Sequence, residues 1–173
     1  MFNTRKKQSG FALLEVMASV AIISFSMLGV FSLVIYNQKI YLDNKYKFVG
    51  TTLSQEGIEL VRNVRDSNWI DGSAFNDGLD LPIFTIDTNS NIKGSINAVT
   101  GIDDNGAKVK LLGAFYNHAL GDDTIFSRII QIDNIDEVGG NAIDGLKVTS
   151  FVQWKYRNIT RQHQTVVFLY DWR

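Results

Sequence analysis

The chain has 173 residues, with 18 acidic side chains, 17 basic side chains and no cysteine. Its length suits one domain plus an anchor. The lack of cysteine excludes disulfides and thiolate metal sites. A formal net charge of −1 gives no general attraction to nucleic acid.

The first predicted element is an apolar run from Phe11 to Tyr36 that follows a short basic segment. As a helix it would be roughly 40 Å long at about 1.5 Å per residue, enough to cross a hydrocarbon core of about 30 Å. Arg5, Lys6 and Lys7 precede it, so the positive-inside rule places the N-terminus in the cytoplasm and the rest outside. We therefore expect a single-pass protein of the cytoplasmic membrane.

A cleavable secretory signal is the main alternative for this run. Its apolar core would span about 7–15 residues before a small-residue cleavage site. The run observed is longer, and no such site follows it. Glu15 lies inside the run, where a charged side chain is costly and usually functional. The simpler interpretation is that the chain is an ordinary single-span anchor and that the polar Glu15 side chain reaches the membrane interface.

The junction Ser9-Gly10-Phe11-Ala12-Leu13-Leu14-Glu15 resembles the processing site of type IV pilins and type II secretion pseudopilins. The resemblance implies that a prepilin peptidase cuts between Gly10 and Phe11 and that Phe11 is then N-methylated. It also implies that Glu15 pairs with the Phe11 amine of a neighbouring subunit during assembly. Ala12 stands where the family usually has Thr, and the apolar run lacks the proline of many major pilins.

The resemblance divides the chain into three segments. Residues 1–10 would be a cytoplasmic leader, residues 11–36 the transmembrane and assembly half of a long helix, and residues 37–173 an exported pilin head that includes an amphipathic half-helix. Removing the leader takes three of the 17 basic side chains, which leaves 14 against 18 acidic ones and a net charge of −4. The implied partners are the peptidase, other pilins in a helical filament and an inner-membrane assembly platform.

Apolar residues continue at helical spacing beyond Tyr36, which predicts one helix from about Phe11 to Asp66. The polar triplet Asp66-Ser67-Asn68, followed by Asp71-Gly72-Ser73, predicts its end. The segment Gln55–Trp69 resembles minor-pilin-like proteins and, with the missing proline, favours a minor subunit. The simpler interpretation of that segment is a helix face that packs on a sheet, which we prefer to a catalytic use of Glu56 or Glu59.

The remaining chain has the pattern of short strands separated by Asn, Asp and Gly. Alternation is clearest in 146–156, where the apolar residues fall on one face. A loop at 157–160 and a second strand at 165–172 would complete a hairpin. The other candidate strands are 84–86, 92–99, 108–115 and 125–132. A helix covering an antiparallel sheet gives an α+β, pilin-like fold.

Nothing in the sequence indicates a catalytic, cofactor-binding or metal site. His118 and His163 are too far apart for a metal motif, and we expect both to be polar surface residues. Acidic loops around Asp77 and Asp104 match no calcium loop, so solvated turns are preferred. Trp154 lies among basic residues near the C-terminus, but alternation places it on the apolar face, so a nucleic-acid partner is not expected.

The sequence therefore predicts a structural subunit of a type IV pilus or type II secretion pseudopilus, not an enzyme. The alternative is a single-span, membrane-anchored extracytoplasmic binding or sensor domain that does not assemble. Adhesion, motility, DNA uptake and secretion all stay open as the purpose of the fibre.

Overall fold

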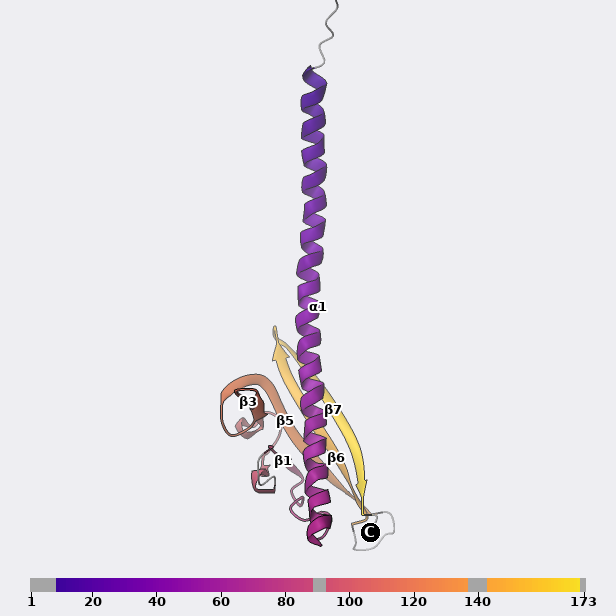
Figure 1. Ribbon diagram of the computed structural model, residues 1–173, viewed down its shortest axis with the longest axis vertical. Helices are drawn as coiled ribbons and strands as arrows, with labels where there is room; N and C mark the ends of the chain where they lie inside the picture. The colour runs from indigo at the N-terminus through magenta and orange to yellow at the C-terminus, as the bar shows by residue number, and fades with distance from the viewer. Residues whose placement is uncertain (1–8, 89–92, 137–142, 172–173) are drawn as a thin grey trace, which may run out of the picture. The chain divides into compact units, whose positions relative to one another are not determined.

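The computed structural model describes residues 9–88, 93–136 and 143–171. It contains two structural units, an N-terminal unit up to Lys45 and a C-terminal unit from Tyr46 onward. A single helix, α1 (Ser9–Asp71, 63 residues), runs through the first unit and into the second (Figure 1). Seven antiparallel strands follow it in the C-terminal unit. The predicted α+β architecture is confirmed.

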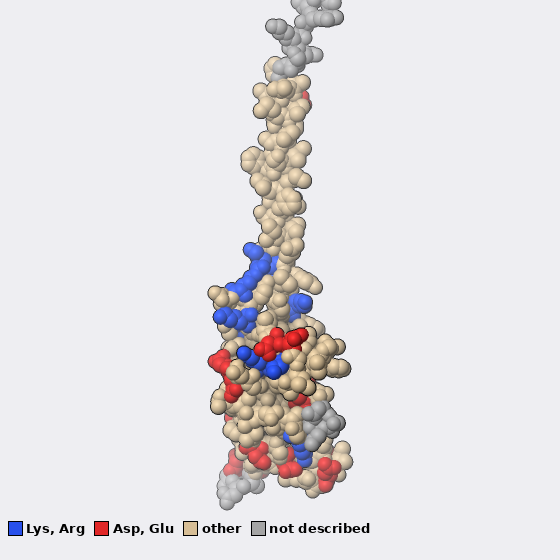
Figure 2. All heavy atoms as spheres, turned by 90° about the vertical axis from the view of Figure 1, so that its left-hand side faces the viewer, with Lys and Arg blue, Asp and Glu red and all other residues tan. Residues whose placement is uncertain are grey.

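In the N-terminal unit, every side chain from Phe11 to Ile40 is exposed. Figure 2 shows this apolar stretch of α1 as a surface almost without charge. The serine hydroxyls within it donate hydrogen bonds to the carbonyl four residues earlier, at 2.8 to 2.9 Å, which satisfies them inside the helix. These serines are Ser19, Ser24, Ser26 and Ser32. This stretch is thus an apolar helix whose four serine hydroxyls are paired internally.

The predicted end of α1 near Asp66 is wrong, because the helix continues to Asp71. Gly72 then takes a φ of 70°, a left-handed conformation that glycine adopts without a steric penalty. The N–H of Ser73 donates to the carbonyl of Asn68 at 2.9 Å, as in a Schellman cap. The glycine, and not the polar triplet before it, ends the helix.

Asn68 explains why that triplet does not break the helix. Its side chain is fully buried, and its amide donates to the carbonyls of Phe75 and Asp77 at 3.1 and 2.9 Å. The polar group therefore faces inward and holds the loop that follows the helix.

The strands form one seven-stranded sheet. The central strand β5 (Asp122–Ile135) pairs along one edge with β6 (Gly145–Tyr156), which pairs in turn with β7 (Ile159–Tyr170). Its other edge is shared by two short pairs. These are β1 (Ile83–Thr85) with β2 (Asn97–Ala98), and β3 (Lys108–Leu112) with β4 (Phe115–Asn117). Short 3₁₀ helices occupy Lys93–Ser95 and Asn105–Ala107.

The α1 face of the C-terminal unit packs on the sheet through two groups of buried side chains. The larger contains Ile58, Val61 and Val64 from α1, with Ile130 from β5 and Val148 from β6. The smaller joins Leu53 to strand residues that include Phe126 and Trp154. Two helix glycines, Gly50 and Gly57, lie where a Cβ would come within 3 Å of sheet side chains. Close helix–sheet contact explains why glycine stands at helix positions that it destabilises.

The sheet follows the predicted alternation but differs in its boundaries. The buried face of β6 carries Leu146, Val148, Val152 and Trp154, as predicted. The expected strand at 108–115 is instead a hairpin that turns at Gly113, and within 92–99 only Asn97–Ala98 is a strand, with residue 92 outside the described residues. The expected loop at 157–160 is a two-residue turn, so β7 begins at Ile159.

Candidate functional site

The predicted processing site lies at the start of α1. Gly10, Phe11 and Glu15 are all helical. The Phe11 side chain is 86% exposed and Glu15 is also exposed, so neither is held by contacts within the chain. Glu15 follows Phe11 by four residues, which places both on the same side of the helix, about 6 Å apart along its axis.

A cut before Phe11 would make it the first residue of the helix. The new amine would then stand at the positive end of the helix dipole, and Glu15 would lie one turn further along. A carboxylate close to a helix N-terminus stabilises the helix. A chain cut there would present one amine and one carboxylate, both on an exposed part of the helix.

One helix in the described residues is long and apolar enough to cross a membrane, judged by length and composition, and it lies near the N-terminus. Glu15 is the one acidic residue between Phe11 and Tyr36, and that stretch holds no lysine or arginine. A lone carboxylate in such a stretch needs a partner charge if it is removed from water.

Residues 5–31 match the family model of the prokaryotic N-terminal methylation motif. The match includes Gly10, Phe11 and Glu15 and most of the apolar run. The chain is type IV pilin-like. No curated protein and no solved structure matches the chain.

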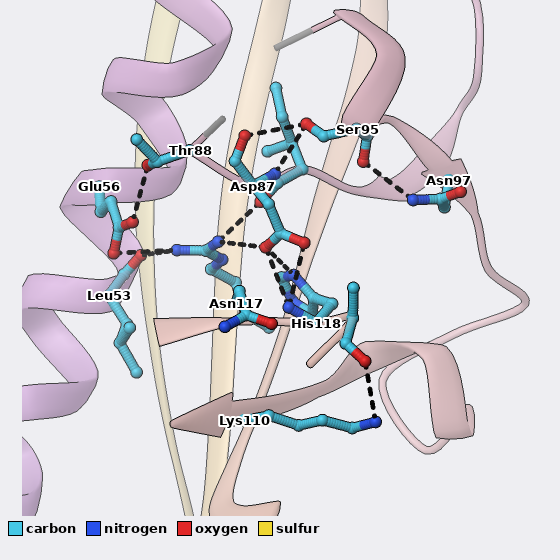
Figure 3. A network of polar contacts seen from close by, with 12 residues as sticks. Leu53, Glu56, Asp87, Thr88, Ser95, Asn97, Lys110, Asn117 and His118 are labelled. Carbon is cyan, nitrogen blue, oxygen red and sulfur yellow. Dashed lines mark hydrogen bonds and ion pairs between the residues drawn. The ribbon is translucent and has the colours of Figure 1, made fainter. Parts of the chain in front are cut away.

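The C-terminal unit of this pilin-like protein contains a second arrangement of note, a buried polar network centred on Arg128 of β5 (Figure 3). The Arg128 side chain is 1% exposed. Its guanidinium donates to the carbonyls of Ile86 at 2.7 Å and Leu53 at 3.3 Å. It also lies 3.3 Å from the carboxylate of Glu56 and 3.7 Å from that of Asp87. One cation therefore connects α1, the segment after β1 and the central strand.

Asp87 connects this network to His118. The Nδ1 atom of His118 lies 2.5 Å from an Asp87 carboxylate oxygen, and the His118 backbone N–H donates to both oxygens at 3.0 and 3.1 Å. On its other side, the Asp87 backbone exchanges hydrogen bonds with the Ser95 hydroxyl at 2.9 and 3.0 Å. The segment after β1 is thereby fixed to the loop that follows β4.

The charges of the network compensate one another. Burial opposes ionisation of Asp87, but the hydrogen bonds and charge of His118, with the charge of Arg128, outweigh it and hold the Asp87 pKa below its ordinary value. Burial lowers the pKa of Arg128, although Glu56 and Asp87 oppose that change. Arginine stays protonated in proteins, so a permanent buried cation faces two carboxylates.

A paired His and Asp also occur in hydrolytic sites, but this pair lacks the rest of such a site. The His118 side chain is 4% exposed, and its Nε2 atom has no hydrogen-bond partner among the described residues. A general base needs a proton donor within reach of its free nitrogen. The arrangement therefore serves to hold the helix, sheet and loops together.

The sequence did not predict this network. His118 was expected at the surface, which is wrong, because it is buried against Asp87. Arg128 was not singled out, although a signal was present. It occupies an inward position in β5, alternating with the buried residues Phe126 and Ile130. A charged residue in that register must have buried partners.

The other candidate residues have local roles. Asp77 forms an ion pair with Lys93 at 2.9 Å, and Asp104 accepts hydrogen bonds from Thr100 and Gly106 in its own turn. No group of three or more His, Asp or Glu side chains in the described residues could hold a metal ion. Trp154 is buried under α1, where it cannot stack on a nucleic-acid base.

Proposed function

We propose that the chain is a prepilin, cut between Gly10 and Phe11, N-methylated on Phe11, and assembled through α1 into a type IV pilus or type II secretion pseudopilus. The observation that carries this proposal is the methylation motif over residues 5–31, together with an apolar run from Phe11 to Tyr36 that holds a single carboxylate, Glu15. The leader would be residues 1–10, the membrane and assembly segment 11–36, and the exported head 37–173.

The orientation follows from the basic residues before the helix. Three basic side chains, Arg5, Lys6 and Lys7, would keep the N-terminus in the cytoplasm and leave the head outside. The partners would be a prepilin peptidase, other pilins and an assembly platform in the inner membrane. The resemblance of Gln55–Trp69 to minor-pilin-like proteins favours a subunit present in few copies.

The proposed role of Glu15 rests on electrostatics. When apolar helices leave lipid for a helix bundle, one apolar environment replaces another, so burial alone gives little driving force. Opposite charges in a low dielectric attract strongly, and an unpaired charge there is costly. Pairing of Glu15 with the Phe11 amine of a neighbour would therefore favour one axial register of the helices.

The test of processing is co-expression with a prepilin peptidase, followed by N-terminal sequencing and mass spectrometry. We expect the mature chain to start at methylated Phe11. The Gly10→Val variant should stay uncut, because a branched side chain would obstruct the peptidase. The matched control is Gly29→Val, which places the same side chain where no atom lies within 4 Å, and it should be cut normally. An intact Met1 or a cut elsewhere would favour an anchored domain that does not assemble.

A further inference from the structure

The two ends of the C-terminal unit carry different side chains. At one end, Tyr46 packs on Tyr156 and Phe126, with ring centroids 4.8 and 6.3 Å apart, so the β6–β7 turn lies beside the first helical turn of the unit. We name this the Tyr46 end. At the Asp71 end, α1 stops. The Tyr46–Asp71 part of α1 is about 40 Å long at about 1.5 Å per residue. This separation is well beyond the Debye length of about 8–10 Å, so exposed charges at the two ends of one copy are screened from each other.

The Tyr46 end is basic. Lys47, Lys155 and Arg157 are exposed, and none of them has a carboxylate partner among the described residues. Beside them, the apolar side chain of Ile159 is 55% exposed at the start of β7. Exposed cations at the rim of an interface steer a partner that carries the opposite charge.

Arg157 is also in a backbone conformation that does not suit it. Arg157 and Asn158 form the two-residue turn between β6 and β7, with φ of 49° and 61°. Turns of this kind favour Asn or Gly at both positions, because positive φ brings a Cβ into steric conflict with the backbone. Asn158 fits that preference and Arg157 does not. The Arg157 guanidinium lies over the Tyr156 ring, 5.2 Å from its centroid, and this contact keeps the cation at the exposed turn.

The Asp71 end has the complementary features. Asp71, Asp136 and Asp171 are exposed there, and Figure 2 shows acidic side chains around this end. The backbone N–H of Asp171 donates to the carbonyl of Asp144 at 3.1 Å, which brings a further carboxylate close. Asp71 follows a helical turn without a basic residue, where the helix dipole disfavours an anion. The Asp71 charge therefore does not stabilise α1 through the helix dipole.

A hollow of about 210 Å³ opens beside one of these carboxylates, that of Asp171. Its lining comes from the end of α1, the loop after it and the end of β7, with Trp69, Phe75 and Asp171 among the residues. Next to it, the side chain of Ile70 is 83% exposed. The hollow thus offers two aromatic side chains, Trp69 and Phe75, beside polar groups that include the Asp171 carboxylate.

We propose that the β6–β7 turn of one copy docks into this hollow at the Asp71 end of a second copy. Ile159 would enter the hollow, and Arg157 would meet Asp171 and Asp71 at its rim. The proposal rests on the proposed function, since it requires copies to stand side by side with their axes parallel and displaced by about 40 Å, the length of the unit along α1.

Such a contact is heterologous and leads to an open filament, because each copy has one turn and one hollow. It is also weak by itself. A single turn buries far less than the roughly 800 Å² per partner of a stable complex, and exposed ion pairs contribute little. Helix packing within the fibre would supply the high effective concentration that it needs. The C-terminal unit alone should therefore be monomeric at micromolar concentration.

Disulfide trapping tests the contact in the assembled fibre, and the absence of native cysteine makes it specific. Thr160→Cys lies beside Ile159, and Ser73→Cys lines the hollow. Full-length chain with both substitutions should give a ladder of disulfide-linked copies in sheared fibres on non-reducing gels. The pair Thr160→Cys with Lys108→Cys, whose second cysteine is on β3, should give none. If fibres contain the processed double variant but show no ladder of linked copies, the contact is wrong and the proposed function stands. If the chain stays unprocessed, the result counts against the proposed function.

Charge exchange gives an independent test. Arg157→Glu or Asp171→Arg alone should lower incorporation into fibres by about tenfold, since facing like charges is costly. Co-expression of the two single variants should restore incorporation, because the turn of one then matches the hollow of the other. Lys108→Glu, with the same change in net charge, should incorporate normally. Loss without rescue would mean that the neighbour is a different subunit, which overturns the proposal.

Discussion

The guanidinium of Arg128 on β5 lies 3.3 Å from the carboxylate of Glu56 on α1, so a buried cation on the central strand pairs with a partly exposed carboxylate on the helix that covers it. The same guanidinium donates to a helix carbonyl, that of Leu53, and to the carbonyl of Ile86. Three segments far apart in the sequence thus depend on one side chain for their polar contacts.

Arg128→Ala should therefore lower the free energy of unfolding by roughly 3–5 kcal/mol, because two carboxylates lose their buried cation. The measurement is urea unfolding of the fragment that begins at Asn37, which lacks the apolar run and should be soluble. Arg62→Ala is the control, since its ion pair with Glu59 is exposed and should change stability by less than about 1 kcal/mol. Equal midpoints for the two variants would contradict a structural role for Arg128.

The Asp87 carboxylate should make the fold sensitive to acid. Its pKa is lowered in the folded state, so the unfolded chain binds a proton more readily. The stabilisation is then complete above the ordinary pKa of about 3.9 and is lost as pH falls through the folded value. Urea midpoints measured from pH 6 to pH 3 should fall more steeply for the wild type than for Asp87→Asn. Parallel curves would show that the carboxylate contributes nothing specific.

Gly57→Ala should destabilise the head although alanine is the better helix former. A Cβ at Gly57 would lie 2.5 Å from Ser150 Oγ and 2.8 Å from Ile130 Cδ1. Overpacking of this kind typically costs about 1–3 kcal/mol, against a gain of about 1 kcal/mol in helix propensity. Ser150 Oγ has no hydrogen-bond partner among the described residues, so Ser150→Ala should be mild and should relieve part of the clash. A rise in the unfolding midpoint for Gly57→Ala alone would show that the helix can move off the sheet.

Local patterns in the sequence predicted most of the fold. Alternation identified the buried face of β6, and helical spacing identified the face of α1 that carries Leu53 and Val64. Boundaries were less predictable, because long-range contacts decided them. Buried Asn68 let α1 continue through a polar triplet, and pairing with Tyr156 let β7 begin at Ile159.

The two parts of the candidate site differ in the same way. The motif with Gly10, Phe11 and Glu15 is contiguous, so it could be identified without a structure. The Arg128 network is assembled from α1, β5 and two loops, and its His118 came from a segment that looked like ordinary surface. Partners separated by many residues leave no spacing pattern, and only the inward register of Arg128 indicated that a buried charge needed them.

Glu15→Ala should leave membrane insertion intact, because it removes a charge from the apolar run. Incorporation into sheared fibres should fall, because the methylated Phe11 amine of a neighbour loses its counter-charge in a low-dielectric bundle. The measurement is the ratio of fibre-bound to membrane-bound processed chain. Ser19→Ala is the matched control, and it should assemble normally. It removes a hydroxyl one helical turn from Glu15, and that hydroxyl donates to the Glu15 backbone carbonyl at 2.8 Å. If both variants enter fibres as well as the wild type does, Glu15 does not pair with that amine and its charge must be satisfied at the membrane interface instead.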